Sequence, residues 1–157
     1  MSTEPPRAIA AADVETVQGT GYPAPYDAPC AERLKRKLGD QFGLADFGVN
    51  MVTLPPGCWS SQRHWHSLED EFIHVLEGHP TLVTDAGETA LAPGMCAGFK
   101  AGTADGHHLV NRTDAPVTYL EVGSRKLDDD VDYPDHDLQL LKAKRGGWFT
   151  RRNGDAA

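Results

Sequence analysis

Two histidines one residue apart, followed by a carboxylate, are the residues of this sequence best suited to chemistry. His64 and His66 lie in the stretch SSQRHWHSLEDEF, and Glu71 follows His66 after four intervening residues. Side chains two apart on a strand share a face, so the two imidazoles project together and Trp65 points the other way. A turn through residues 67–70 would bring Glu71 beside them. Such a set suits a single divalent transition metal, and we consider Zn, Fe, Mn and Ni.

A second histidine pair offers one more imidazole for the same site. His107 and His108 are adjacent, so they fall on opposite faces of a strand, and one of them must point inward. The carboxylate is also open to an alternative, because Glu69 or Asp70 would replace Glu71 if the turn had a different register. The sequence thus predicts a site with three imidazoles and one carboxylate.

The pattern of short apolar runs and turns predicts an all-β fold. From Phe47 to residue 125, about eight short strands alternate with turn signals such as PPG and PGM, and the connections are too short for helical crossovers. We predict antiparallel sheets forming a sandwich or barrel over residues 46–126. A Pro-rich segment, 1–45, is expected to lie extended across the barrel, with a short helix or turn in AERLKRKLGD. Residues 127–157 are expected to form an acidic segment and a tail.

Composition narrows the classes of partner. The chain has 157 residues, a net charge of −8 and three cysteines. The length suits one domain, and the negative charge argues against a nucleic-acid partner. The N-terminus lacks a signal-peptide core, and no apolar run is long enough to cross a membrane. An odd cysteine count without a Cys-x-x-Cys motif fits a reducing compartment, so we predict a cytoplasmic protein without membrane partners.

The spacing around the first histidines resembles the first motif of the cupin superfamily. That motif runs Gly, about five residues, His-x-His, three or four residues, Glu, six residues, Gly. Here Gly57 is followed by six residues, His64-x-His66, four residues, Glu71, six residues and Gly78. The resemblance covers roughly residues 40–125. It implies an antiparallel double-stranded β-helix, or jelly-roll barrel, with a metal at its centre.

The second cupin motif is matched at its end and altered at its start. His107 and Asn111 are separated by three residues, as in the family pattern, and this match implies that His107 rather than His108 is the fourth ligand. Lys100 stands where the pattern has proline, and four residues separate Gly102 from His107, which implies a longer loop. Lys100 itself is expected to be a surface lysine at a strand end. All four metal positions of the family are filled.

Residues beside the ligands bear on the reaction. Gln62 shares the strand phase of His64, and we take it as the candidate catalytic residue for contacting substrate or water. Arg63 and Arg112 fall out of phase with the ligands, which argues against a phosphate bound deep in the barrel. On the last strand of the barrel, Leu120 and Val122 are expected to face inward in preference to Tyr119 and Glu121. No general base beyond the ligands is therefore predicted.

The resemblance leaves several functions open, because cupins include dioxygenases, isomerases, lyases, and binding and storage proteins. The sequence looks most like small stand-alone bacterial cupins, some of which are described as sugar phosphate isomerases. A metal-dependent enzyme acting on a small polar substrate is the leading prediction, and sugar phosphate isomerisation is its most specific form. The alternatives are a non-catalytic protein that binds a sugar or carboxylate, and an Fe(II) dioxygenase. A homodimer is also expected, because Trp65, Phe72, His74 and Leu76 fall on an outward face that needs cover.

Overall fold

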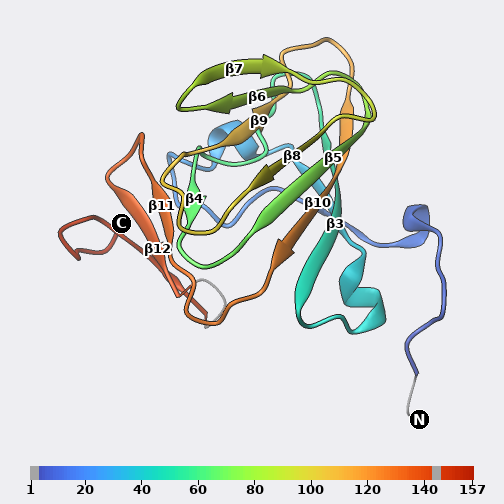
Figure 1. Ribbon diagram of the computed structural model, residues 1–157, viewed down its shortest axis with the longest axis horizontal. Helices are drawn as coiled ribbons and strands as arrows, with labels where there is room; N and C mark the ends of the chain where they lie inside the picture. The colour runs from blue at the N-terminus through green and yellow to red at the C-terminus, as the bar shows by residue number, and fades with distance from the viewer. Residues whose placement is uncertain (1–3, 143–145) are drawn as a thin grey trace.

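The computed structural model describes residues 4–142 and 146–157, which form antiparallel strands in three sheets (Figure 1). The large sheet has the order β1 (Thr16–Gln18), β2 (Leu34–Lys37), β3 (Phe47–Leu54), β10 (Val117–Ser124), β5 (Glu71–Glu77), β8 (Cys96–Phe99). A second sheet has the order β13 (Trp148–Thr150), β12 (Leu138–Leu141), β11 (Val131–Tyr133), β4 (Trp65–His66). The third has the order β7 (Gly87–Ala90), β6 (Thr81–Thr84), β9 (His108–Val110).

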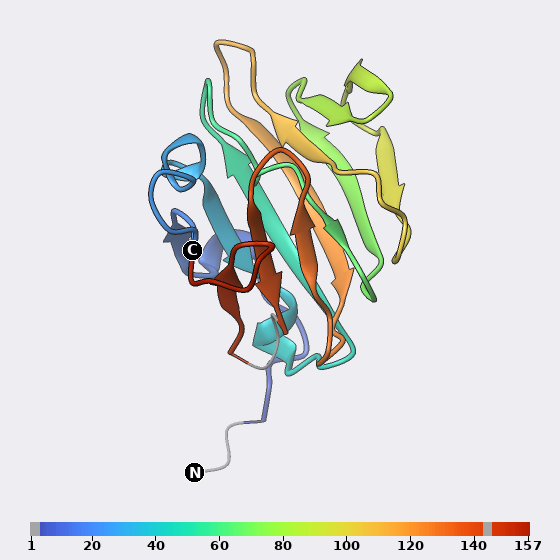
Figure 2. The same ribbon diagram turned by 90° about the vertical axis from the view of Figure 1, so that its left-hand side faces the viewer.

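Helical structure is confined to three short 3-10 helices among the described residues. They are η1 (Ala11–Asp13), η2 (Ala28–Cys30) and η3 (Gly39–Phe42). No helix in that part of the chain is long and apolar enough to cross a membrane. The expected antiparallel all-β architecture is confirmed. The second sheet and the large sheet form two layers (Figure 2).

The inner face of the large sheet changes from apolar to polar along its strands. Directly opposed residues of neighbouring strands share a face, so the register defines rows across β3, β10 and β5. The rows, from the apolar end, are Leu54–Val117, Val52–Tyr119–Val75, Asn50–Glu121–Ile73 and Gly48–Gly123–Glu71. Residues of the first two rows are almost fully buried and form the core. The last two rows place polar side chains and glycines at the other end, where the sheet faces a cavity.

The segments that flank the predicted barrel contribute strands to these sheets. The short helix or turn expected in AERLKRKLGD is wrong for Leu34–Lys37, which forms β2 and pairs with β3. The exposed edge of β3 offers unpaired backbone groups, and this long-range pairing overrides the local helical preference. β1 then pairs with β2 at the edge of the sheet.

The expected acidic segment and tail also form strands. β11, β12 and β13 pair in sequence, and β11 adds to β4, which carries His66. Between the acidic residues, Val131, Tyr133 and Leu138 are nearly fully buried and make a small second core with Tyr22 and Tyr26. Because aspartates separate these apolar residues in the sequence, no strand pattern was recognised there. The last part of the chain therefore closes one wall of the site.

Candidate metal centre

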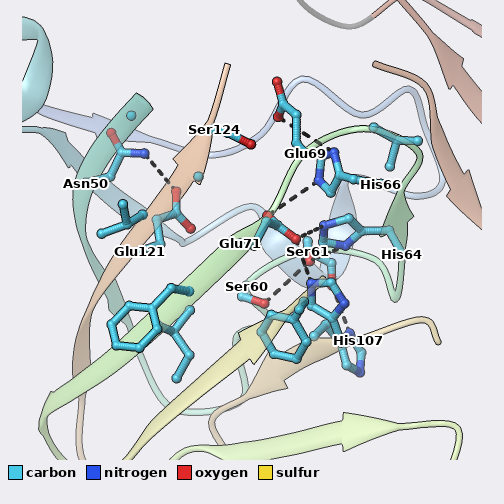
Figure 3. Close-up of a pocket in the computed structure, with 18 of the residues that line it drawn as sticks. Asn50, Ser60, Ser61, His64, His66, Glu69, Glu71, His107, Glu121 and Ser124 are labelled. Carbon is cyan, nitrogen blue, oxygen red and sulfur yellow. Dashed lines mark hydrogen bonds and ion pairs between the residues drawn. The ribbon is translucent and has the colours of Figure 1, made fainter. Parts of the chain in front are cut away.

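Four side chains converge where β4, β5 and the segment before β9 meet. The Nε2 atoms of His64, His66 and His107 lie 3.4, 3.4 and 2.7 Å from carboxylate oxygens of Glu71. Ligand atoms of His64, His66 and Glu71 all lie within 4.8 Å of one another. An isolated bridge pairs the backbones of His64 and His107, which fixes how these two side chains approach (Figure 3). The structure thus brings together the four residues that the sequence selected.

The hydrogen bonds behind two of the imidazoles leave Nε2 free for a metal. Nδ1 of His64 lies 2.9 Å from the carbonyl oxygen of Gln62, and Nδ1 of His66 lies 2.6 Å from Oδ2 of Asp129. A carbonyl and a carboxylate only accept hydrogen bonds, so Nδ1 carries the proton in both rings. In the neutral form of each ring, the lone pair is therefore on Nε2, the nitrogen that lies on the side of Glu71. This donor set fits a divalent transition metal.

Asp129 is a functional residue that the sequence did not single out. It is fully buried, and its Oδ1 accepts hydrogen bonds from the backbone N–H groups of Leu68 and Glu69, 2.8 and 3.2 Å away. Its other oxygen binds His66, so Asp129 ties the turn before β5 to the imidazole. Asp129 lies in a run of three aspartates, where nothing local separates it from its exposed neighbours.

Glu69, the alternative to Glu71, lies behind the imidazoles. Its Oε2 is 3.8 Å from Nδ1 of His66, and its Oε1 accepts a hydrogen bond from the backbone N–H of Lys126. His66, Glu69 and Asp129 also offer three ligand atoms within 4.8 Å of one another. Nδ1 of His66 is engaged with Asp129, however, while all three Nε2 atoms face Glu71. The geometry therefore favours Glu71 as the ligand.

Electrostatics couple the carboxylate to the imidazoles. Burial by itself raises the pKa of Glu71, but His64, His107 and His66 outweigh it and hold the pKa well below its usual range. Burial lowers the pKa of His66, but its hydrogen bonds to Asp129 and Glu71 dominate and raise the pKa to about 10. Burial lowers the pKa of His107. The metal-free site therefore holds an ionised Glu71 against a protonated His66.

The four residues line one side of a cavity of about 820 Å³. The walls come from β2, β3, β5 and β10 of the large sheet and from the strands that face it. Phe99 supports the site from β8, where its ring stacks on His107 with a centroid distance of 3.6 Å. A smaller pocket of about 210 Å³ shares His66, Glu71 and His107 with the large cavity and includes Lys100, which is exposed at the end of β8 as expected.

Gln62, the candidate catalytic residue, does not line the large cavity. Its side chain is buried, its Nε2 donates to the carbonyl oxygen of Tyr26 at 2.7 Å, and its Oε1 lies 2.8 Å from Nε2 of His136. The amide is therefore occupied at both ends by protein groups. Gln62 ties the N-terminal segment to the loop after β11, and its carbonyl oxygen positions His64.

On β10 the inward residues are Tyr119 and Glu121, contrary to the expectation that Leu120 and Val122 face inside. The expectation assumed an apolar interior, whereas this end of the sheet faces a polar cavity. Oε1 of Glu121 binds Nζ of Lys35 at 2.5 Å and Nδ2 of Asn50 at 2.9 Å. Burial raises the pKa of Glu121, but Lys35 outweighs burial and lowers it. An ionised carboxylate that is not a candidate ligand therefore stands in the cavity beside Glu71 (Figure 3).

Basic side chains also reach the cavity, but from segments that the sequence did not implicate. Arg63 and Arg112 point away as expected, Arg63 toward Asp85 and Asp135 and Arg112 toward Glu88. The four basic residues that line the cavity are Arg33, Lys35 and Lys37, in or next to β2, and Arg125, which follows β10. The pairing of β2 with β3 places the first three there. This removes the objection that the interior lacks cations for a phosphate.

Comparison with known proteins agrees with the fold. A family model described as Cupin domain matches residues 50–123. The chain is 43% identical to a sugar phosphate isomerase of the cupin superfamily from Silicibacter pomeroyi DSS-3, with 96% of each chain covered and a TM-score of 0.92. A structure from Acidithiobacillus ferrooxidans is 28% identical over 83% of each chain, with a TM-score of 0.75. No curated protein matches the chain.

A more distant structure supports the fold alone. It is a polyketide cyclase from Streptomyces resistomycificus, 22% identical over 76% of this chain and 80% of its own, with a TM-score of 0.62. The chain belongs to the cupin superfamily. The match over nearly the whole length of the Silicibacter pomeroyi protein includes the strands before and after the Cupin domain match.

Proposed function

We propose that this protein is a divalent-metal-dependent isomerase of a sugar phosphate, with the metal held by His64, His66, Glu71 and His107. The observation that carries the proposal is the Glu121 carboxylate, which lines the same cavity as the four ligands and is not one of them. A titratable group beside a metal site is what proton transfer requires. The 43% identity to a sugar phosphate isomerase supports the choice of substrate class.

A bound divalent metal would act as a Lewis acid on the carbonyl or hydroxyl oxygens of the substrate. Glu121 would move a proton from the hydroxyl-bearing carbon to the neighbouring carbonyl carbon, while the proton of that hydroxyl passes to the former carbonyl oxygen. Both contacts of its carboxylate, from Lys35 and Asn50, go to Oε1, and no hydrogen bond from the described residues reaches Oε2. Oε2 can therefore take the proton from one carbon and return it to the next, while Lys35 and Asn50 fix the orientation of the carboxylate.

Metal analysis followed by a substrate screen tests this function. The purified protein should contain about one divalent metal per chain, and the double variant His64→Ala, His66→Ala should lose it while remaining folded. Isomerisation of sugar phosphates should then require the metal, and Glu121→Gln should retain the metal but lose at least about a hundredfold in rate. Unchanged metal content in the double variant would refute the site. A fully active Glu121→Gln protein would refute the role of Glu121.

Two alternatives remain distinct outcomes of the same screen. An Fe(II) dioxygenase would contain iron and consume dioxygen with a substrate. A non-catalytic protein would bind sugars or carboxylates and return them unchanged with every first-row metal. The polar lining around Glu121 and Lys35 favours catalysis over simple binding.

We also propose a homodimer formed through the outer face of the large sheet. Phe72 and Leu76 are 42% and 39% exposed there, and Val122 lies opposite Phe72 on the neighbouring strand. Further apolar residues of this face are Phe47, Val49, Met51 and Leu120. An antiparallel sheet with an apolar outer face needs cover, and a second copy presents a face of the same character. Light scattering should give twice the 17.0 kDa chain mass, and Phe72→Glu should give a monomer.

The cysteines support a cytoplasmic location. All three are free thiols, with Cys30 and Cys58 buried and Cys96 exposed. Burial raises the pKa of Cys30 to about 11 and also raises that of Cys58, so neither is an activated nucleophile. Free thiols of this kind suit a reducing compartment.

A further inference from the structure

We propose that Lys37 and Arg125 bind the phosphate group of the substrate, at the end of the cavity away from the imidazoles, and that the carbon chain lies over Gly48 and Gly123. This inference rests on the proposed function for the kind of substrate. It adds the direction in which the substrate lies and the residues that select its phosphate. All four residues line the large cavity.

Between Glu71 and these two cations, the residues on the inner face of the sheet are glycines. Gly48 and Gly123 are directly opposed on β3 and β10, and Gly123 is opposed in turn to Glu71 on β5. The three residues form one row across the inner face, so the floor of the cavity beside Glu71 is bare backbone. A Cβ built on Gly123 would lie 3.7 Å from the carbonyl oxygen of Asp70, which is ordinary contact distance. The backbone thus tolerates a side chain at Gly123, and glycine leaves space there.

The guanidinium of Arg125 lies at the far end of this row. A Cβ on Gly48 would be 3.4 Å from both Nε and Nη2 of Arg125, which places the group over that glycine. Nη1 donates to the carbonyl oxygen of Leu44, and Nη2 pairs with Asp40 at 2.5 Å. These contacts hold the guanidinium in place and leave Nε–H without a protein acceptor among the described residues.

Among the described residues, no carboxylate and no hydrogen-bond acceptor is paired with the amine of Lys37, which also lines the cavity. It is opposed to Asn50 in the register, so it rises from the inner face next to the glycines. Lys35 is paired with Glu121, and Arg33 donates to the carbonyl oxygens of Ser60 and Gly19. With Asp40 counted, Lys37 and Arg125 leave one net positive charge at this end. Such a site favours a phosphate dianion over a neutral sugar.

The distance between the two ends matches an open-chain sugar. Glu71 and Gly48 are two strand spacings apart, which is roughly 10 Å. An extended chain of about five or six carbons spans most of that distance, given a carbon–carbon bond of about 1.5 Å. A substrate with its carbonyl end at the metal site would place its terminal phosphate between Lys37 and Arg125, and its reacting carbons would pass beside Glu121.

Calorimetry of ligand binding to the purified, metal-containing protein tests the phosphate site. The ligands are D-ribose 5-phosphate, D-glucose 6-phosphate and the two corresponding unphosphorylated sugars. Lys37→Gln and Arg125→Gln should each weaken binding of the sugar phosphates by about tenfold to a hundredfold, the usual effect of losing a hydrogen bond to a charged group. Binding of the unphosphorylated sugars should not change. Arg112→Gln, which removes an arginine paired with a glutamate outside the cavity, is the matched control and should behave as wild type.

A second variant tests the glycine floor. Gly123→Val should weaken binding of the sugar phosphates, because its side chain occupies the path of the carbon chain, while inorganic phosphate should compete as in wild type. Because none of the residues that the structure describes forms an ion pair with Lys37, Lys37→Gln is expected to fold normally, and thermal unfolding checks this.

Different results would refute the phosphate site and the isomerase activity. Sugar phosphates that bind in a Lys37- and Arg125-dependent manner but are never isomerised would sustain the phosphate site and refute the isomerase. Isomerisation with unchanged binding in folded Lys37→Gln and Arg125→Gln would overturn the phosphate site and leave the isomerase standing. A wild-type protein that prefers the unphosphorylated sugars would overturn the phosphate site as well.

Discussion

The substitution Asp129→Asn isolates the contribution of one buried carboxylate to the metal site. Oδ1 of Asp129 accepts hydrogen bonds from the backbone of Leu68 and Glu69, and Oδ2 accepts from Nδ1 of His66 at 2.6 Å. Asparagine is almost the same size, and its oxygen can keep the backbone contacts. Its NH₂ group would then face the Nδ1–H of His66, donor against donor. His66 would relieve this by losing the proton on Nδ1 and keeping the proton on Nε2, the atom that points at Glu71.

The expected magnitude follows from this change of protonation. Loss of an outer partner of a metal-bound histidine typically weakens metal affinity by about tenfold to a hundredfold, or about 1.4–2.7 kcal/mol. The metal-free protein should also lose about 1.5–3 kcal/mol of stability, because a buried hydrogen bond between charged groups is removed. Burial raises the pKa of Asp129, but its hydrogen bond to His66 outweighs this and lowers the pKa, so the carboxylate is ionised at neutral pH.

Competition with a chelator measures the affinity, and nitrogen NMR of the imidazoles reports which ring nitrogens are protonated. Asp135→Asn is the matched control, because it makes the same change at an exposed aspartate that pairs with Arg63. We expect metal-free His66 to carry protons on both ring nitrogens in the wild type and in the Asp135 variant, and on Nε2 alone in the Asp129 variant. A folded Asp129→Asn protein with wild-type metal affinity and with both nitrogens of His66 still protonated would refute the reasoning.

Three further predictions concern protonation and backbone geometry. The pKa of His66 is about 10 without metal, so metal binding at neutral pH should release a proton. The metal affinity should therefore increase by up to about tenfold for each pH unit by which the pH is raised toward 10. Calorimetry in two buffers of different ionisation heat detects the released proton, and equal heats in both buffers would contradict this. Lys35→Met should raise the pKa of Glu121 and move the acidic limb of the isomerase rate profile to higher pH, and an unmoved limb would exclude Glu121 as the base. Gly78→Ala should destabilise the fold by about 2–5 kcal/mol in chemical denaturation, because φ is +79° and the new Cβ would lie 2.6 Å from Cγ1 of Val117; wild-type stability would contradict the geometry.

The convergence of His64, His66 and Glu71 was predictable because its signal is local. His64 and His66 share a face through the two-residue period of an extended chain, and Glu71 follows after a short turn. The two motifs added His107, which the neighbouring strands bring to the same carboxylate. The all-β class followed equally from short strands between frequent turns. These features depend on neighbouring residues or on motif spacing, and a single sequence carries both.

The packing of the two segments that flank the predicted barrel, residues 1–45 and 127–157, depends on contacts between residues that are distant in the sequence. Asp129 meets His66 from 63 positions away, and Lys35 meets Glu121 across 86 positions, because β11 adds to β4 and β2 adds to β3. No local pattern marks a strand that forms by completing the edge of another sheet. The cations of the cavity were missed for the same reason.

Strand β10 shows which features the sequence determines and which the tertiary structure decides. The sequence determines that Tyr119 and Glu121 lie on one side of the strand and Leu120 and Val122 on the other, since alternation is a property of the backbone. Which side is the interior depends on what the sheet encloses. A wholly apolar core would select the leucine and valine, but β2, β3 and β5 surround a polar cavity at this end, and there Lys35 compensates the charge of Glu121. The tertiary structure therefore decided that the Glu121 carboxylate faces the candidate metal site. Only the assembled sheet supplies Lys35, the cation that offsets the free-energy cost of removing this carboxylate from water.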